Sequence, residues 1–178
     1  RRDAAGRMRG APHEKVRWGI LGAGGIADRR TLPGMQLAEH AEIVSVMEID
    51  PAFAERLREK YHAKRAYSDD AALLSDPEID AVYIASPVAC HARQATLAAD
   101  NGKHILIEKP LAMTAAEGEA VVSHCRERGV KIAAGLMMRF GAYVQAMKAA
   151  IAEGKIGNVV SCFAHFTCWY PDMPGSWR

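Results

Sequence analysis

The chain has 178 residues, of which 49% are hydrophobic and 25% charged, the mixture of a soluble globular protein that can bury one sizeable core. This composition excludes disordered and collagen-like classes, and no stretch approaches the ~20 apolar residues of a membrane helix. The formal net charge is +2, and residues 1–15 hold five basic and two acidic side chains. The rest of the chain lacks the basic patch that nucleic-acid binding requires, so we do not expect a nucleic acid as a partner. Because no stretch suits a membrane helix, we expect no membrane partner either.

The four cysteines form no C-x-x-C pair and lie within apolar stretches, which predicts reduced thiols and a cytoplasmic protein; they are Cys90, Cys125, Cys162 and Cys168. Residues 1–15 have no apolar core and are interpreted as a disordered leader rather than a secretory signal. This leader is either an upstream start, with Met8 as an alternative initiator, or a remnant added to the protein.

From Val16 onward, short apolar or β-branched runs alternate with longer segments of helical periodicity, which predicts βαβ units and a parallel sheet in the α/β class. The predicted strands are Arg17–Leu21, Ile43–Glu48, Ala66–Tyr67, Ala81–Ser86, His104–Glu108 and Lys131–Ala134. One helix is predicted after the first strand, and the others are Pro51–Tyr61, His91–Asp100, Thr114–Arg128 and Ala142–Glu153. Thr114 with Glu117 matches a capping box, and Gly129 ends its helix.

The pattern of apolar residues changes near Gly154–Asn158. From Val159 onward, apolar residues alternate along NVVSCFAHFTCWY, which predicts a strand of another, antiparallel sheet. We therefore expect one domain over residues 16–154 and the start of a second, α+β domain over residues 155–178.

Directly after the first predicted strand comes a G-x-G-x-x-A loop, Gly22-Ala23-Gly24-Gly25-Ile26-Ala27. In such a loop, the first glycine permits a tight turn, the second admits a pyrophosphate close to the backbone, and the last small residue lets the following helix pack closely. The position between a strand and a helix favours dinucleotide binding over a plain glycine turn.

Glu48 ends the next strand, 21 residues after Ala27, at the spacing of the carboxylate that binds the adenosine ribose hydroxyls. A carboxylate there repels a 2′-phosphate, so NAD is favoured over NADP. Asp50 is a competing ribose ligand, although with Pro51 it also suits the start of a helix. Arg29 and Arg30 keep NADP open as the alternative.

Ligands of open α/β sheets bind beyond the carboxyl ends of the strands, where Ser86-Pro87 and Glu108-Lys109-Pro110 lie. Pro110 holds Lys109 outside regular structure, and a lysine partly desolvated beside a cofactor can exchange a proton with a substrate oxygen. The alternative is a surface lysine paired with Glu108.

The run DAVYIASPVACHARQATLAADNGKHILIEKPLA, together with GAGGIA, resembles the glucose–fructose oxidoreductase, inositol dehydrogenase and rhizopine-catabolism (Gfo/Idh/MocA) family of nicotinamide-dependent oxidoreductases. The resemblance implies an N-terminal Rossmann domain followed by an antiparallel sheet that forms the substrate pocket. It implies that Lys109 orients the reacting oxygen and exchanges its proton, with the Lys109–Pro110 bond often cis. It also implies cofactor contacts from Glu108 to the nicotinamide ribose, and from Ser86, Pro87, His91 and Arg139. For His91, capping or packing is the alternative.

The sequence departs from the family in places. Met137 stands where many members have Asn, and Ala142 where many have Pro. The family's catalytic Asp and His come after a Trp-Arg like Trp177-Arg178, so we expect the N-terminal part of a longer enzyme, able to bind the cofactor but inactive alone. Trp177 either covers the nicotinamide or belongs to a surface loop.

The favoured function is an NAD(P)-dependent oxidoreductase that moves hydride between the nicotinamide and a ring carbon of a sugar, cyclitol or related polyol, in a homo-oligomer. A non-catalytic NAD(P)-binding regulator on the same scaffold is the alternative, and a product that mediates protein contacts is a third. The histidines lack metal-ligand spacing, so no metal site is expected.

Overall fold

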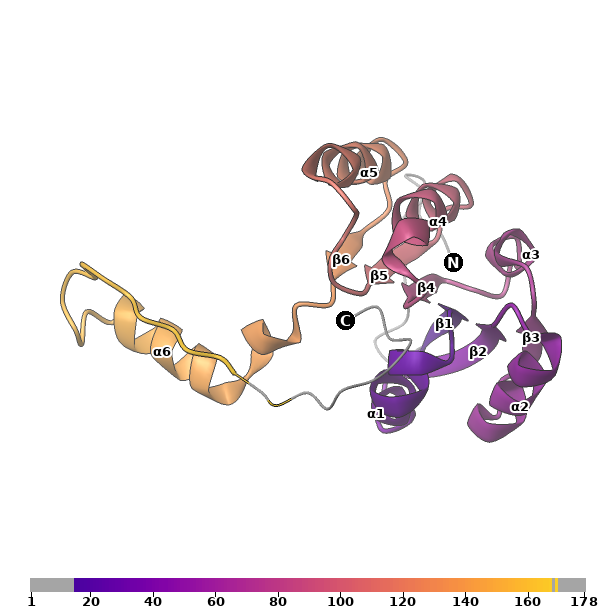
Figure 1. The fold of residues 1–178 in the computed structure, drawn as a ribbon, viewed down its shortest axis with the longest axis horizontal. Coiled ribbons are helices and arrows are strands. Elements are labelled where there is room, and N and C mark those ends of the chain that lie inside the picture. Colours follow the sequence, from indigo (N-terminus) through magenta and orange to yellow (C-terminus); the bar gives the residue numbers. More distant parts are fainter. Residues whose placement is uncertain (1–14, 168, 170–178) are drawn as a thin grey trace. The chain divides into compact units, whose positions relative to one another are not determined.

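The computed structural model of the chain describes residues 15–167 and 169. Six parallel strands form one sheet in the order β3-β2-β1-β4-β5-β6 (Figure 1). The strands are β1 (Val16–Leu21), β2 (Ala41–Met47), β3 (Arg65–Tyr67), β4 (Ala81–Ile84), β5 (His104–Ile107) and β6 (Ile132–Ala134). This is the Rossmann-type α/β fold expected from the sequence. The strands predicted to end at Glu48, Ser86 and Glu108 end at Met47, Ile84 and Ile107, so these three residues lie in the loops that follow.

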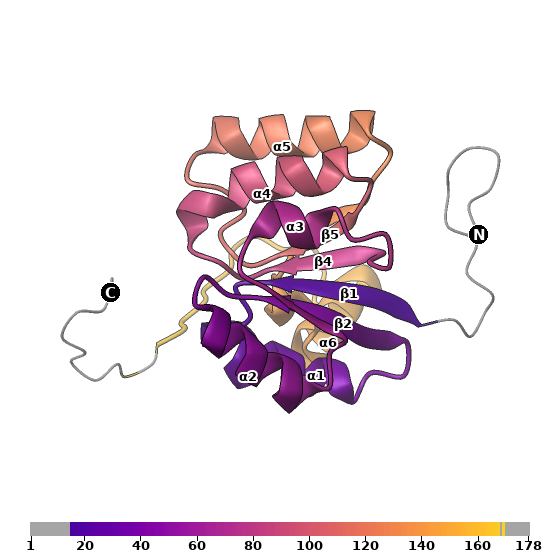
Figure 2. The same cartoon turned by 90° about the vertical axis from the view of Figure 1, so that its right-hand side faces the viewer.

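Helices cover both faces of the sheet (Figure 2). On one face lie α3 (Asp70–Leu74), α4 (Val88–Asp100) and α5 (Ala115–Glu127), and on the other lie α1 (Leu32–Gln36) and α2 (Pro51–Tyr61). A π-helical turn, Ala27–Thr31, connects the glycine loop to α1. Within the residues that the structure describes, no helix is long and apolar enough to cross a membrane.

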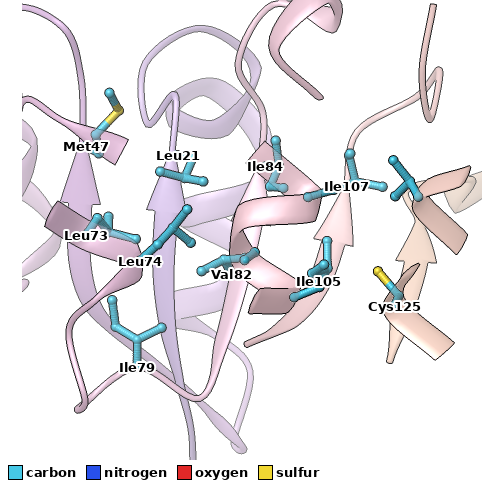
Figure 3. Close-up of a cluster of buried hydrophobic side chains, with 14 residues drawn as sticks. Leu21, Met47, Leu73, Leu74, Ile79, Val82, Ile84, Ile105, Ile107 and Cys125 are labelled. Atoms are coloured by element: carbon cyan, nitrogen blue, oxygen red, sulfur yellow. The ribbon is translucent and has the colours of Figure 1, made fainter. Parts of the chain in front are cut away.

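Each face of the sheet has its own apolar core, because successive side chains of a strand point to opposite faces. Leu21, Val82 and Ile84 pack with α3, α4 and α5 (Figure 3), whereas Ile20 and Tyr83 pack with α1 and α2. All four residues of β4 are buried. The central strands therefore lack a polar face, which explains their weak alternation.

Side-chain caps fix where several helices begin. Asp50 accepts a hydrogen bond from the backbone N–H of Ala52 at 2.9 Å, and Thr114 accepts one from Glu117 at 3.2 Å. Thr114 is thus confirmed as the cap, whereas the Glu117 carboxylate accepts the backbone N–H of Met113, the residue before the cap. The short helix α3, which begins after its cap Asp69, is absent from the sequence prediction.

The described residues divide into two compact units, with the boundary between Leu136 and Met137. The first ends earlier than the expected boundary near Gly154. The second contains a 3-10 turn, Met137–Phe140, and α6 (Ala142–Ala152). Residues 158–167 form no ladder with another strand of the described residues, so the antiparallel strand predicted from Val159 stays a prediction. Residues 1–14 of the predicted leader and Trp177 lie outside the described residues.

Candidate cofactor site

The order of the strands reverses between β1 and β4, so the loops that leave their carboxyl ends diverge and open a crevice there. Leu21 pairs in register with Met47 and Ile84, and Ile84 pairs with Ile107. The carboxyl ends of these four strands therefore lie level at the same end of the sheet. The loops after these strands carry nearly all the predicted site residues of the first unit. They are Gly22, Gly24, Gly25, Ile26 and Ala27 after β1, Glu48 after β2, Ser86 and Pro87 after β4, and Glu108 and Lys109 after β5.

Gly22 and Gly24 are required by close contacts. Gly22 has a φ of +71°, and a Cβ there would lie 2.6 Å from the backbone nitrogen of Ser86. At Gly24, a Cβ would lie 2.8 Å from both the Glu48 Oε1 and the Phe53 Cε1. At Gly22 the neighbouring atoms are backbone, so the glycine loop packs directly on the loop after β4, whereas at Gly24 they belong to side chains.

Gly25 is different, because it is exposed and a Cβ there would meet nothing within 4 Å. Its φ of +54° favours glycine nonetheless. Ile26 is 40% exposed, whereas Ala27 is fully buried beneath the loop. The loop therefore offers an uncovered backbone at Gly25, the kind of surface that a pyrophosphate can approach.

The structure separates the two candidate ribose ligands. The Glu48 Oε1 accepts the backbone N–H of Gly24 at 2.6 Å, which holds the carboxylate beside the glycine loop. Asp50 instead caps α2. Arg29 donates its Nε–H to the Gly25 carbonyl at 3.1 Å and is exposed, as is Arg30. The arrangement favours Glu48 as the ribose ligand.

A chain of side chains from α3 and α4 orients Ser86. Asp70 pairs with Arg93 and accepts the Gln94 Nε2–H at 3.0 Å. The Gln94 Oε1 must then face Ser86, whose hydroxyl donates to it at 2.5 Å. With its proton used in this way, Ser86 offers only acceptor lone pairs to a ligand.

His91 lies within the first turn of α4 rather than at its start, and it is 1% exposed. Its Nδ1 lies 2.9 Å from the Pro110 carbonyl oxygen, and its Nε2 lies 2.9 Å from the Ser86 carbonyl oxygen. Both ring nitrogens are engaged within the protein. The structure therefore favours the packing interpretation, in which His91 joins the loops after β4 and β5.

Glu108 does not pair with the ammonium of Lys109. Its Oε1 accepts the Tyr83 hydroxyl at 2.7 Å, and its Oε2 accepts the backbone N–H of Lys109 at 3.1 Å. Lys109 is exposed, and within residues 15–167 no side chain forms an ion pair with its ammonium. The Lys109–Pro110 bond is cis, as the resemblance implies. The surface ion pair considered as the alternative is therefore absent from this structure.

Arg139 and Met137 belong to the second unit, where the Arg139 carbonyl accepts a hydrogen bond from Gln145, and their roles stay predictions. Among the described residues, no group of three or more His, Cys, Asp or Glu side chains is placed to hold a metal ion.

Comparison with known proteins identifies the family. Residues 16–136 match the Gfo/Idh/MocA model, described as an oxidoreductase family with an NAD-binding Rossmann fold. The chain belongs to this family. It is 36% identical to a D-xylose 1-dehydrogenase (NADP(+)) from Haloferax volcanii over 87% of the chain and 47% of the relative. It is 33% identical to a 1,5-anhydro-D-fructose reductase from Ensifer adhaerens over 91% of the chain and 48% of the relative.

Solved structures agree with this assignment. The scyllo-inositol dehydrogenase from Lactobacillus casei, crystallised with NAD(H) and scyllo-inositol, superposes with a TM-score of 0.76 at 25% identity, covering 82% of this chain and 43% of that one. A 3-ketoreductase from Actinomadura kijaniata, in complex with TDP-benzene and NADP, gives 0.74 at 28% identity over 79% and 44%. This Gfo/Idh/MocA chain spans about half the length of the curated relatives it matches.

Sequence reasoning missed the residues that support the site from beneath. Gln94 and Asp70 orient Ser86, whereas Tyr83 contacts Glu108 and Thr31 in turn contacts Tyr83. No local motif marks them, because each partner is separated from the other by several to dozens of residues.

Proposed function

We propose that the whole protein is an NAD(P)-dependent oxidoreductase that transfers hydride between the nicotinamide and a CH–OH carbon of a sugar, cyclitol or related polyol. The observation that carries this proposal is that the glycine loop, the Glu48 carboxylate hydrogen-bonded to it and Lys109 all follow the carboxyl ends of neighbouring strands of one parallel sheet. The named relatives and the structures with NAD(H) and NADP support it.

The residues present fit a dinucleotide. Gly25 would receive the pyrophosphate on its uncovered backbone, Glu48 would accept the adenosine ribose hydroxyls, and Ser86 and Glu108 would face the nicotinamide half, on the β4–β5 side of the crevice. When bound, the nicotinamide supplies the hydride chemistry.

The protein's own contribution is orientation and proton transfer. Lys109 would hold the reacting oxygen and exchange its proton at Nζ, a role open to an ammonium without a carboxylate partner among the described residues. Glu108, fixed through both oxygens, would orient the ribose. The substrate and the homo-oligomeric assembly belong to the whole protein and are part of this proposal.

The cofactor site is tested by isothermal titration of the purified chain with NADH and NADPH in parallel. We expect tighter binding of NADH, and we expect Glu48→Ala to weaken NADH about tenfold or more, the scale of a hydrogen bond to a charged group, so that the preference disappears. Asp50→Ala is the matched control. It removes a carboxylate two residues away that caps α2, so it should lower stability and leave the NADH/NADPH ratio unchanged.

The result that contradicts the proposal is a folded chain that binds neither cofactor. If Asp50→Ala rather than Glu48→Ala removes the preference, the assignment of the ribose carboxylate is wrong while the dinucleotide site stands. For the whole protein, Lys109→Ala should lower kcat by about 10²–10⁴ with little change in NADH affinity, since it removes acid–base assistance. A regulator without catalysis would bind the cofactor, and adding a polyol would not change that binding.

A further inference from the structure

Tyr83 occupies an unusual place for a polar side chain. It lies in the middle of β4, is 1% exposed, and packs in the apolar core that faces α1 and α2. Its hydroxyl nevertheless reaches two polar partners, the Glu108 Oε1 at 2.7 Å and the Thr31 Oγ1 at 2.9 Å. A core position that needs only volume would be filled by Phe, so the hydroxyl calls for an explanation beyond packing.

The direction of each hydrogen bond follows from the groups involved. An ionised carboxylate only accepts, so Tyr83 donates to Glu108, and the Tyr83 oxygen then accepts from the Thr31 hydroxyl. Burial, reinforced by the hydrogen bond to Glu108, raises the pKa of Tyr83 above its ordinary value, although the Thr31 contact opposes this. Tyr83 therefore stays a neutral, fixed donor and takes no part in acid–base chemistry at physiological pH.

This chain of hydrogen bonds joins two segments of the crevice. Thr31 is the last residue of the π-helical turn that follows the glycine loop, and Glu108 immediately precedes Lys109. The Glu108 Oε1 is fixed by Tyr83 from within the sheet, while its Oε2 is fixed by the backbone N–H of Lys109. The carboxylate is thus held at both oxygens and stays partly exposed at the mouth of the crevice.

We propose that Tyr83, assisted by Thr31, is a positioning residue for the cofactor: it presets the Glu108 carboxylate to accept hydroxyls of the nicotinamide ribose. The inference rests on the proposed dinucleotide function. Fixing the acceptor in advance removes the conformational entropy that binding would otherwise have to overcome. Because Glu108 lies on the β5 side of the crevice, the effect is confined to the nicotinamide half of the dinucleotide.

The test compares NADH with ADP, which carries only the adenosine half and its phosphates, in titrations of the full chain and of Tyr83→Phe. Phe keeps the ring and removes only the hydroxyl. We expect Tyr83→Phe to weaken NADH about tenfold and to leave ADP unchanged. A merely structural role for Tyr83 would lower both affinities together. Thr31→Val, which removes the second hydroxyl, should weaken NADH by a smaller factor and again spare ADP.

A double-mutant cycle with Glu108→Ala tests the route. If Tyr83 acts through Glu108, adding Tyr83→Phe to Glu108→Ala causes no further loss of NADH affinity. An unchanged NADH/ADP ratio in both Tyr83→Phe and Thr31→Val, or full additivity in the cycle, overturns the inference. Should Tyr83→Phe not fold, Thr31→Val alone decides by the same ratio. Failure of the unmodified chain to bind NADH instead overturns the proposed function.

Discussion

The contact between the glycine loop and the loop after β4 makes Gly22 the position where a single methyl group should do the most harm. A Cβ at Gly22 would lie 2.6 Å from the Ser86 nitrogen, 2.7 Å from the Ser86 Cα and 2.9 Å from the Ala85 carbonyl carbon. All three are backbone atoms, which cannot swing aside as the end of a side chain can. Relief would require the loops after β1 and β4 to separate.

The size of the effect follows from two contributions. A positive φ costs a residue with a Cβ about 1–2 kcal/mol, and forcing a methyl group into a packed backbone contact adds about 1–3 kcal/mol. Gly22→Ala should therefore lower the free energy of unfolding by about 2–5 kcal/mol. Gly25→Ala is the matched control, because its φ of +54° is also positive while a Cβ there meets nothing within 4 Å. It should cost only the first contribution, about 1–2 kcal/mol.

Urea unfolding followed by far-ultraviolet circular dichroism measures both variants against the unmodified chain. Equal losses of stability in Gly22→Ala and Gly25→Ala would refute the reasoning, since the contact with Ser86 would then contribute nothing. A larger loss at Gly25 would place the tight approach on the wrong glycine.

Three further outcomes are expected. Gly24→Ala should disturb function more than folding, because its Cβ would meet the movable Glu48 Oε1 and Phe53 ring at 2.8 Å. Calorimetric titration should show that the preference for NADH over NADPH is reduced. A preserved preference would contradict the assignment of Glu48 as the ribose ligand. Burial alone would raise the pKa of Asp80, but hydrogen bonds from the side chain and backbone of Arg17 outweigh it and lower that pKa. The resulting stabilisation is complete above the unfolded pKa of about 4 and is lost as the pH falls through the lower folded value, so the acid-induced loss of unfolding free energy should be shallower in Asp80→Asn. Cys125 is 1% exposed and burial raises the pKa of its thiol, whereas Cys162 is exposed, so peptide mapping after brief alkylation should find Cys162 modified and Cys125 protected until the chain is unfolded.

The sequence predicts the architecture well where long-range packing and local pattern agree. The strands are central and covered on both faces, so their apolar runs are unmistakable, and Pro51–Tyr61 is found with its predicted bounds because proline and a capping Asp50 fix its start. The helix α3 was missed because its five residues are too few to show a helical period. The π-helical turn has no compositional signature either.

The errors at strand ends share one cause. Ser86 and Glu108 continue apolar runs in the sequence, but their backbone leaves the ladder, and their side chains turn to Gln94 and Tyr83. The strand predicted from Val159 stays a prediction for a related reason: alternation describes one strand, whereas a ladder needs a partner that no local pattern can supply.

The site divides into groups that are fixed and one group that is not. Glu48 is held by the Gly24 N–H, Ser86 by Gln94 on the face of the sheet covered by α3 and α4, and Glu108 by Tyr83 on the face covered by α1 and α2. Each acceptor is therefore ordered before a ligand arrives, which leaves binding free energy for recognition rather than for ordering. Lys109, by contrast, has no ion-pair partner within residues 15–167. The groups proposed to orient the cofactor are thus rigid, and the group proposed to move a proton remains free to do so.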